Sequence, residues 1–373
     1  MTDLAVQYQM KSDRVHVLDK PDTYIGSIQD TDTNMWCFDQ ETGKIVLKNI
    51  SYIPGLYKLY DEGIVNCRDH IVRMLNKEGS VNVTYIEVSI DDDGTITFCN
   101  DGSGVDVIKH PEHTELWIPE MIFGHLRSST NYDKTKKNTL GSINGLGVKL
   151  AFIWSTEASV ETVDVTRGLK YTQRFLENLS IIEKPTITKV KTTKPYTRVS
   201  FKPDYARFGI QNLSPDMISL LKKRVYDVSG LTDTTSKVKM IYNKEVIPVK
   251  NFQQYVDLYI GKKDGDIGKR VYEKLNDRWE VCIAISPTQQ FEQVSFVNGI
   301  CTYKGGKHVD YVLGQILRKV QAYIEKKKKI VVNINTIKFQ NILCIFSKVC
   351  KLKKIGICFI AFYAIVRILY ILV

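Results

Sequence analysis

Hydrophobic positions recur every three or four residues between Pro54 and Leu75, in the segment PGLYKLYDEGIVNCRDHIVRML. This spacing places the apolar side chains on one side of a helical cylinder, and a proline in the first turn suits the start of a helix. The segment VTYIEVSIDDDGTITFCNDG instead alternates apolar and polar residues on both sides of Asp-Asp-Gly. The pattern therefore predicts a long helix followed by a hairpin of two strands.

The rest of the chain mixes shorter helical and alternating segments. Helical patterns return at residues 116–127, 148–153 and 308–326. Alternation predicts further strands in SVETVDVT, YTQRFLEN, TRVSFKPD, VKMIYNKEVIPV, WEVCIAISP and EQVSFVNGICTY. A polar linker at residues 234–237 separates two groups of elements, so we expect a domain boundary there. The order of elements predicts an α+β fold with a small second domain.

Composition and charge narrow the class of protein only slightly. With 373 residues, 43% hydrophobic and 25% charged, the chain has the balance of a folded globular protein and room for two to three domains. This excludes a disordered or fibrous chain. The formal net charge of +11 suits an anionic partner such as nucleic acid but does not select one.

The cysteines and the N-terminus indicate an intracellular protein. No two cysteines form a C-x-x-C pair, and MTDLAVQYQMKSDRV lacks the apolar run of a signal peptide. We therefore expect reduced thiols rather than a zinc site or a disulfide framework. The eight are Cys37, Cys67, Cys99, Cys282, Cys301, Cys344, Cys350 and Cys358.

A polar stripe on the long helix is the first candidate for chemistry. Glu62, Asn66 and Asp69 stand at positions i, i+4 and i+7, which places them on one side of the helix. One interpretation is an ordinary solvated face. The other is a carboxylate that activates water beside an amide that binds Mg²⁺.

Two glycine-bearing segments are further candidates. Asp101, Gly102 and Gly104 follow the hairpin, where glycines let the backbone approach a flat ligand and a carboxylate accepts from an exocyclic amine. Alone, D-G-x-G is also a common turn. The segment GSINGLGVK at residues 141–149 opens a helix, and its free N–H groups suit phosphates. It is neither a P-loop nor a dinucleotide fingerprint, and a structural turn is the alternative.

Together these motifs resemble the ATP site of the GHKL superfamily. The segments KPDTYIGS, PGLYKLYDEGIVNCRD, IFGHLRSSTNYD and GSINGLGVKL are similar to the ATPase gate of type IIA DNA topoisomerases of eukaryotes and large DNA viruses. VSFVNGICTYKGGKHVDYV at residues 294–312 resembles the transducer domain of that family. The resemblance implies a GHKL (Bergerat) ATPase sandwich of mixed sheet and helices, followed by a ribosomal-S5-like transducer.

The resemblance also implies a division of the chain and an activity. Residues 1–30 would form an N-terminal arm and strap, 31–235 the ATPase domain, 236–346 the transducer, and 347–373 an aberrant tail. The implied enzyme is the ATP-hydrolysing gate of a topoisomerase, a dimer clamp for DNA strand passage. This chain alone would not cleave DNA, since no cleavage core follows. Its ATPase would be impaired without the γ-phosphate lysine of the family's Gln-Thr-Lys loop.

Roles of individual residues follow from the same resemblance. Glu62 would be the general base that deprotonates water, Asn66 a ligand of ATP and Mg²⁺, and Asp69 a support for the helix face and the nucleotide. Asp101 would contact adenine, while Gly102 and Gly104 let the backbone close on the base. The family's contacts to ribose and phosphate match Ser128, Ser129, Thr130 and Asn131. Its triphosphate lid matches Gly141, Ser142, Asn144, Gly145, Leu146, Gly147 and Lys149.

Three positions depart from the family pattern. The family has a glycine and a basic residue where this chain has Ser142 and Ile143, and His70 replaces a common amide. A stiffer lid backbone and a lost donor put tight nucleotide binding in doubt.

The implied partners are a second subunit and DNA. Tyr8 would cross from the N-terminal arm to the partner's nucleotide, so ATP would close a homodimer. Otherwise it is an exposed aromatic on a terminus. Double-stranded DNA would be held without sequence specificity through phosphate contacts from Lys304, Lys307, His308 and residues 326–329, unless these are simply solvated. We expect the nucleus in a cell, or the host cytoplasm or viral factory for a virus.

The apolar tail and the rival functions complete the sequence interpretation. Residues 355–373 carry Arg367 as their only charge and are long enough to cross a bilayer. We favour a shifted reading frame over a membrane anchor, because the family pattern breaks within a predicted element. Two rivals are a nucleotide-dependent dimerisation module without catalysis and a different GHKL ATPase of the chaperone or mismatch-repair type. A histidine kinase fits less well, since no phosphoacceptor helix precedes the site.

Overall fold

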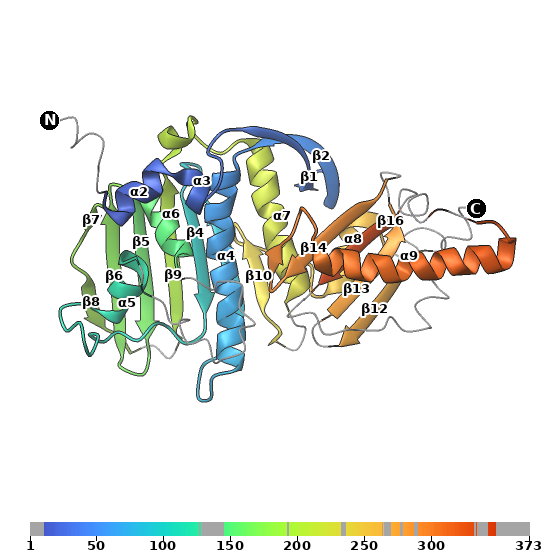
Figure 1. Ribbon diagram of the computed structural model, residues 1–373. Coiled ribbons are helices and arrows are strands. Elements are labelled where there is room, and N and C mark those ends of the chain that lie inside the picture. The colour runs from blue at the N-terminus through green and yellow to red at the C-terminus, as the bar shows by residue number, and fades with distance from the viewer. Residues whose placement is uncertain are drawn as a thin grey trace. The chain divides into compact units, whose positions relative to one another are not determined.

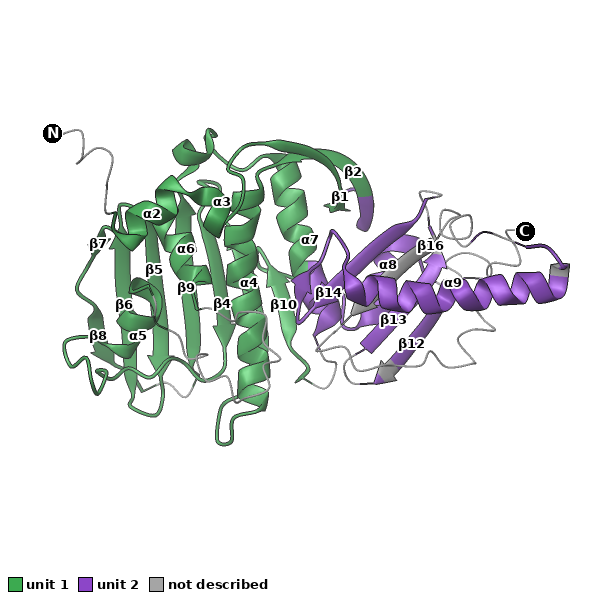
Figure 2. Cartoon of the chain, viewed as in Figure 1, with its two compact units in different colours: residues 1–38, 47–225, 235–247 green, residues 39–46, 226–234, 248–373 purple. Residues whose placement is uncertain are grey.

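The computed structural model describes residues 11–126, 128, 145–191, 194–232, 236–262, 264, 270–276, 279–286, 290–331, 333 and 342–347. The chain forms two compact units (Figures 1 and 2). The first comprises residues 1–38, 47–225 and 235–247, and the second residues 39–46, 226–234 and 248–373. Tyr8, residues 129–144 with most of the predicted lid, and the apolar tail lie outside the described residues.

A mixed nine-stranded sheet is the framework of the first unit. Its order is β11-β10-β3-β4-β9-β5-β6-β7, with β8 paired to β6. Strand β10 runs parallel to β3, and the other pairs are antiparallel. The strands are β3 (Tyr85–Ile90), β4 (Ile96–Asp101), β5 (Ser155–Asp164), β6 (Leu169–Leu176), β7 (Ile181–Ile182), β8 (Thr186–Lys189), β9 (Tyr196–Pro203), β10 (Lys239–Tyr242) and β11 (Glu245–Val246).

Helices cover one face of this sheet, as Figure 1 shows for α4, α5 and α6. The helices are α2 (Asp13–Asp19), α3 (Pro21–Tyr24), α4 (Pro54–Leu75), α5 (Ile118–Gly124), α6 (Gly147–Ile153), the 3₁₀ turn η1 (Tyr205–Phe208) and α7 (Pro215–Leu231). Strands β1 (Thr31–Asp39) and β2 (Lys44–Tyr52) form a separate two-stranded sheet.

The long predicted helix is α4, and it packs closely on the sheet. Its apolar residues Leu56, Leu59 and Ile64 are fully buried. Gly63 permits the close approach, since a Cβ atom there would lie 2.3 Å from the ring of Phe98 on β4. This contact fixes α4 against the strand that carries the predicted glycine turn.

The boundary between the units differs from the predicted one. Strand β10 pairs with β3 through Lys239 opposite Tyr85 and Tyr242 opposite Val88. The segment VKMIYNKEVIPV, which begins beyond the polar linker, therefore completes the first sheet instead of opening the second unit. The first unit extends to Ile247.

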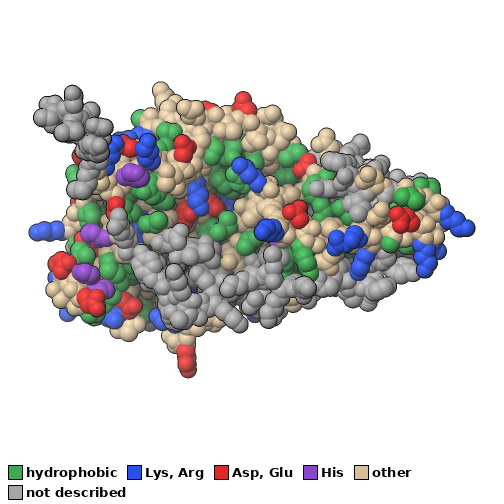
Figure 3. All heavy atoms as spheres, viewed as in Figure 1, with side chains coloured by type: hydrophobic (Ala, Val, Ile, Leu, Met, Phe, Trp, Pro, Cys, Tyr) green, Lys and Arg blue, Asp and Glu red, His purple; other side chains and the backbone are tan. Residues whose placement is uncertain are grey.

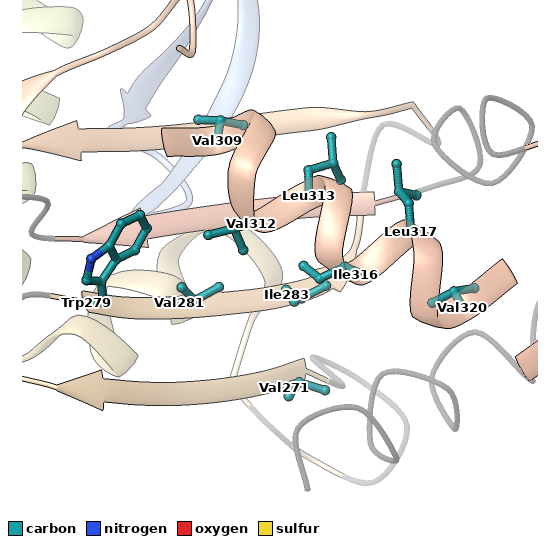
Figure 4. Close-up of a cluster of buried hydrophobic side chains, with 10 residues drawn as sticks. All are labelled: Val271, Trp279, Val281, Ile283, Val309, Val312, Leu313, Ile316, Leu317 and Val320. Atoms are coloured by element: carbon teal, nitrogen blue, oxygen red, sulfur yellow. The ribbon is translucent and has the colours of Figure 1, made fainter. Parts of the chain in front are cut away.

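The second unit is a five-stranded sheet with its own core. The order is β12 (Arg270–Asn276), β13 (Trp279–Ile285), β16 (Ile342–Ser347), β14 (Glu292–Val297) and β15 (Ile300–Cys301), joined by helices α8 (Phe252–Ile260) and α9 (Lys307–Lys328). Figure 4 shows apolar residues of α9, including Val312 and Ile316, facing Trp279 and Val281 of β13. Burial of this apolar surface stabilises the unit.

The described helices include none long and apolar enough to cross a membrane. The apolar segment at residues 355–373 is outside the part of the chain to which this finding applies.

Candidate functional site

A cavity of about 180 Å³ lies within the first unit, where α4 and α6 meet the sheet. Strands β4 and β9, helix α5 and the segment between β4 and α5 complete its wall. Besides residues of α4, the lining comprises Phe98, Asn100, Val105, Ile122, Phe123, Ser128, Gly145, Gly147, Val148, Lys149, Thr197 and Val199. Residues of the predicted helix, of the second hairpin strand and of the glycine segment therefore line one pocket, but Asp101, Gly102 and Gly104 are not among them.

Helix α4 supplies the longest wall of this pocket. Its lining residues recur at steps of three and four, so they share one side of the helix. They are Gly63, Asn66, Cys67, His70 and Arg73. Of the predicted polar stripe, Asn66 lines this cavity.

Asp69, like Glu62, is not among the residues that line the pocket. Its side chain is fully buried, and Oδ1 lies 3.2 Å from the guanidinium of Arg68. A buried carboxylate needs such a partner because water is excluded from it. The predicted role of Asp69 in supporting the helix face and the nucleotide stays a prediction.

Glu62 lies at the edge of the pocket, one turn before Asn66. A Cβ atom on Gly147 would come within 1.9 Å of Glu62 Oε2, so this carboxylate oxygen packs against the bare glycine. The other oxygen forms an ion pair with Lys58. Gly147 lines the pocket, and the carboxylate is therefore held where α4 and α6 meet.

Asn100, rather than Asp101, is the polar side chain that β4 presents to the pocket. Residues along a strand alternate between its two faces, so Asn100 shares the face of Phe98 while Asp101 points the other way. Asp101 Oδ1 accepts from the backbone N–H groups of Thr84 at 2.7 Å and Tyr85 at 2.9 Å. This corrects the predicted adenine contact of Asp101, because its carboxylate instead fixes the start of β3.

The two glycines after Asp101 pack closely against neighbouring protein atoms. Gly102 has φ +93°, and a Cβ atom there would lie 2.8 Å from Val83. A Cβ atom on Gly104 would lie 2.2 Å from the carbonyl oxygen of Val163 on β5. Neither glycine lines the pocket, so their small size is needed for the packing of this loop rather than for closure on a flat ligand.

Lys149 reaches from α6 to the chain segment that follows α5. Its Nζ donates to the backbone oxygen of Ser128 at 2.5 Å and to Ser128 Oγ at 2.8 Å. The side chain is almost completely buried, and burial lowers the pKa of Lys149 to about 8. Burial removes hydrating water and so disfavours the charged form of Lys149. An anion in the pocket would stabilise that charged form.

The lid prediction is described only in part. Gly145 and Gly147 line the pocket, and Gly145 has φ +62°, which favours glycine. Leu146 is the N-cap residue of α6. Ser129, Thr130, Asn131, Gly141, Ser142, Ile143 and Asn144 lie outside the described residues.

Two buried nitrogen atoms near the end of α4, His70 Nε2 and Arg73 Nε, have no hydrogen-bond partner among the described residues. Burial first, and the charge of Arg73 second, lower the pKa of His70 to about 4, so the imidazole is neutral at pH 7. Arg73, Cys67 and Asn100 were not predicted as site residues. The helical repeat indicates Arg73 at i+7 from Asn66 and Cys67 at i+4 from Gly63, and the strand alternation indicates Asn100.

The second unit carries basic side chains on its surface. Lys304 and Lys307 are exposed, as are lysines near the end of α9, and Figure 3 shows Lys and Arg side chains along this region. His308 differs from the prediction. It is buried, it hydrogen-bonds Thr302 Oγ1 through Nε2 at 3.1 Å, and burial lowers its pKa.

Comparison with known proteins gives consistent matches. The DNA gyrase B family matches residues 251–353. DNA topoisomerase 2 of Arabidopsis thaliana is 43% identical over 327 residues, which cover 86% of this chain and 21% of the plant protein. DNA topoisomerase 2 of Acanthamoeba polyphaga mimivirus is 44% identical over 331 residues, which cover 87% of this chain and 25% of the viral protein. The crystal structure of the ATPase region of Saccharomyces cerevisiae topoisomerase II superposes with a TM-score of 0.87 at 35% identity, covering 97% of each chain.

Proposed function

Since this chain belongs to the type IIA DNA topoisomerase family and corresponds to its ATPase and transducer region, we propose that it binds ATP in the pocket beside α4 and hydrolyses it. One observation carries the proposal. The Glu62 carboxylate, the Asn66 amide and the Lys149 amine, from two helices, converge at a single cavity. Attack of water on a phosphoryl group requires a base, a metal ligand and a cation.

We assign the phosphates and the base of ATP to opposite ends of the pocket beside α4. Glu62 and His70 are eight residues apart, or about 12 Å along the axis at 1.5 Å per residue. Gly147 packs against Glu62, and Gly145 and Lys149 lie two residues before and after it in the chain, so we place the phosphates at this end, where backbone N–H groups and a cation suit them. The neutral imidazole of His70 and the amide of Asn100 are left for the base.

Glu62 would act as the general base. A carboxylate accepts the proton of water most efficiently when it is fixed within hydrogen-bond reach of that water. Its contact with Gly147 places Oε2 at the edge of the pocket. Lys149 would stabilise the negative charge that develops on the phosphate oxygens.

The donor set also fits Mg²⁺. This ion prefers oxygen ligands and takes few of them from the protein, with substrate phosphates supplying others. The amide of Asn66 lines the pocket and offers such an oxygen. When bound, the ion would neutralise charge on the phosphates.

The role in a larger machine is part of the same proposal. The chain spans about a fifth to a quarter of the length of the curated relatives it matches. We place it at the ATP-operated gate of a topoisomerase dimer, with Tyr8 of the N-terminal arm reaching the other subunit and the exposed lysines of the second unit contacting DNA phosphates. The site of action would be the nucleus, or a viral factory in the host cytoplasm.

Asn100→Ala is expected to weaken ATP binding by about ten- to a hundredfold, because a buried hydrogen-bonding group of the base loses its partner. Isothermal titration with Mg·ATP measures this. The matched variant Asp101→Ala is expected to lower the melting temperature instead, since it frees the N–H groups of Thr84 and Tyr85. No ATP binding by the wild type would refute the proposed function. An affinity loss confined to Asp101→Ala would reverse the assignment.

ATP affinity is expected to fall as the pH rises above about 8. Lys149 is charged below its pKa of about 8 and neutral above it, and only the charged amine attracts phosphate. Binding is measured from pH 7 to pH 9.5 in the wild type and in Lys149→Met. Lys149→Met should bind ATP more weakly than the wild type at pH 7, and its affinity should not fall between pH 7 and pH 9.5. If the affinity falls equally in both proteins, Lys149 is not the group responsible.

A further inference from the structure

The loop that follows β4 runs along the end of β5 and brings Val105 to the pocket. Val105 lines the cavity. Its backbone N–H donates to Thr162 Oγ1 at 3.0 Å. Two residues later, the backbone N–H of Val107 donates to Asp164 Oδ2 at 3.0 Å. Alternate residues of the loop are therefore bound by alternate side chains of β5.

Thr162 belongs to a row of polar side chains that starts at the base end of the pocket. Asn100 on β4 is the register partner of Thr197 on β9, and Thr197 is the register partner of Thr162 on β5. The hydroxyl oxygens of Thr197 and Thr162 are 2.9 Å apart. Asn100, Thr197 and Val105 all line the cavity. Val105 thus forms part of the wall at the end that we assign to the base.

Arg167, in the turn between β5 and β6, ties this loop to the strand. Its Nη1 donates to Asp106 Oδ1 at 2.6 Å and to Asp164 Oδ2 at 2.6 Å. Its backbone N–H also donates to Asp164 Oδ1 at 3.2 Å. Asp106 stands between the two loop residues whose N–H groups bind β5. The guanidinium therefore joins a carboxylate of the loop to a carboxylate of the strand.

The two carboxylates differ in exposure, which indicates what the bridge does. The side chain of Asp164 is 5% exposed, whereas that of Asp106 is 58% exposed. Burial disfavours the ionised form of Asp164, but hydrogen bonds from Arg167 and Val107 outweigh this effect and lower the pKa of Asp164. Exposed ion pairs such as that of Asp106 contribute little to the stability of a fold. The main effect of the Asp106 contact is therefore on the position of the loop.

We propose that Arg167 and Asp106 are positioning residues for nucleotide binding, which clamp the loop so that Val105 stays in the wall of the pocket. This inference rests on the proposed function, in which this end of the pocket receives the base of ATP. Arg167 and Asp106 are not among the residues that line the pocket. They act by limiting the movement of Val105 away from Asn100 and Thr197. A pocket whose wall is in place for only part of the time binds its ligand proportionally more weakly.

The test compares hydrolysis of Mg·ATP by the full chain with that by Arg167→Gln, Asp106→Asn and the double variant. Each single substitution should raise KM about two- to fivefold, the range that an exposed ion pair supports. The value of kcat should stay within about twofold, because this wall takes no part in proton transfer. The double variant should bind no more weakly than Arg167→Gln, since both side chains act through one contact. The control Arg207→Gln removes another arginine–aspartate pair, with Asp204, and should keep the wild-type KM.

Several outcomes would overturn the proposal. An unchanged KM in both Arg167→Gln and Asp106→Asn would do so, as would an equal rise in Arg207→Gln or a fall in kcat at unchanged KM. Wild-type protein that binds no ATP would instead refute the proposed function. In that case hydrogen exchange of residues 104–107 decides whether the clamp exists. Faster exchange in Asp106→Asn than in Arg207→Gln supports the clamp, and equal exchange refutes it.

Discussion

Replacing Glu62 by glutamine is expected to lower ATP turnover about 100- to 10,000-fold, the usual contribution of a positioned general base. The amide keeps the size of the side chain, so its contact with Gly147 remains possible. It cannot accept a proton from water at neutral pH. Affinity for Mg·ATP should therefore change little while hydrolysis stops. Single-turnover assays at enzyme concentrations above that of ATP separate the two steps.

The comparison also distinguishes the proposed function from its main rival. A nucleotide-dependent dimerisation module would bind ATP and associate without hydrolysis, so wild type and Glu62→Gln would show the same negligible turnover. Equal and substantial rates in both proteins would remove Glu62 from the role of base. Sedimentation with a non-hydrolysable analogue reports dimer formation independently of either result.

Gly147→Ala is expected to reduce hydrolysis by at least about 100-fold, because the new methyl group would occupy the position of the base. The added Cβ would lie 1.9 Å from Glu62 Oε2 and 2.6 Å from Cδ, far inside contact distance. The flexible glutamate side chain would move, since the backbone of α6 is fixed by burial on the sheet. A displacement of about 1 Å at a reacting group costs rates of this order.

Gly314→Ala is the matched control for this substitution. Its added Cβ would meet no atom closer than 3.7 Å, at Arg318, and alanine favours a helix over glycine. This variant should keep the wild-type rate and melt no lower than the wild type. If Gly147→Ala retained full activity with a normal melting temperature, Glu62 would not be held by that contact.

The family and the fold class were predictable from sequence, and comparison confirms both. The helical repeat at α4 is long and strongly periodic, so its polar stripe could be recognised without coordinates. Gly145, Gly147 and Lys149 of the glycine segment line the same pocket, whereas Asp101, Gly102 and Gly104 of the hairpin end do not. Periodicity is a local property, and these elements are specified locally.

Features that depend on pairing between distant segments were not predictable in the same way. The choice between Asn100 and Asp101 depends on which face of β4 turns toward α4, and a one-residue shift exchanges them. The assignment of β10 to the first sheet depends on its partner β3, which no local pattern identifies. The β1–β2 hairpin was missed, and burial of His308 depends on tertiary packing.

The parallel pairing of β10 with β3 has a consequence for synthesis of the chain. Ile90 N donates to the side chain of Asn243, a residue 153 positions later. While the ribosome is still adding the intervening residues, one edge of β3 has no neighbour, and such an edge is a template for association with other chains. The nascent ATPase unit therefore completes its sheet only after Tyr242 has left the exit tunnel, and a product that stops earlier would expose an aggregation-prone border.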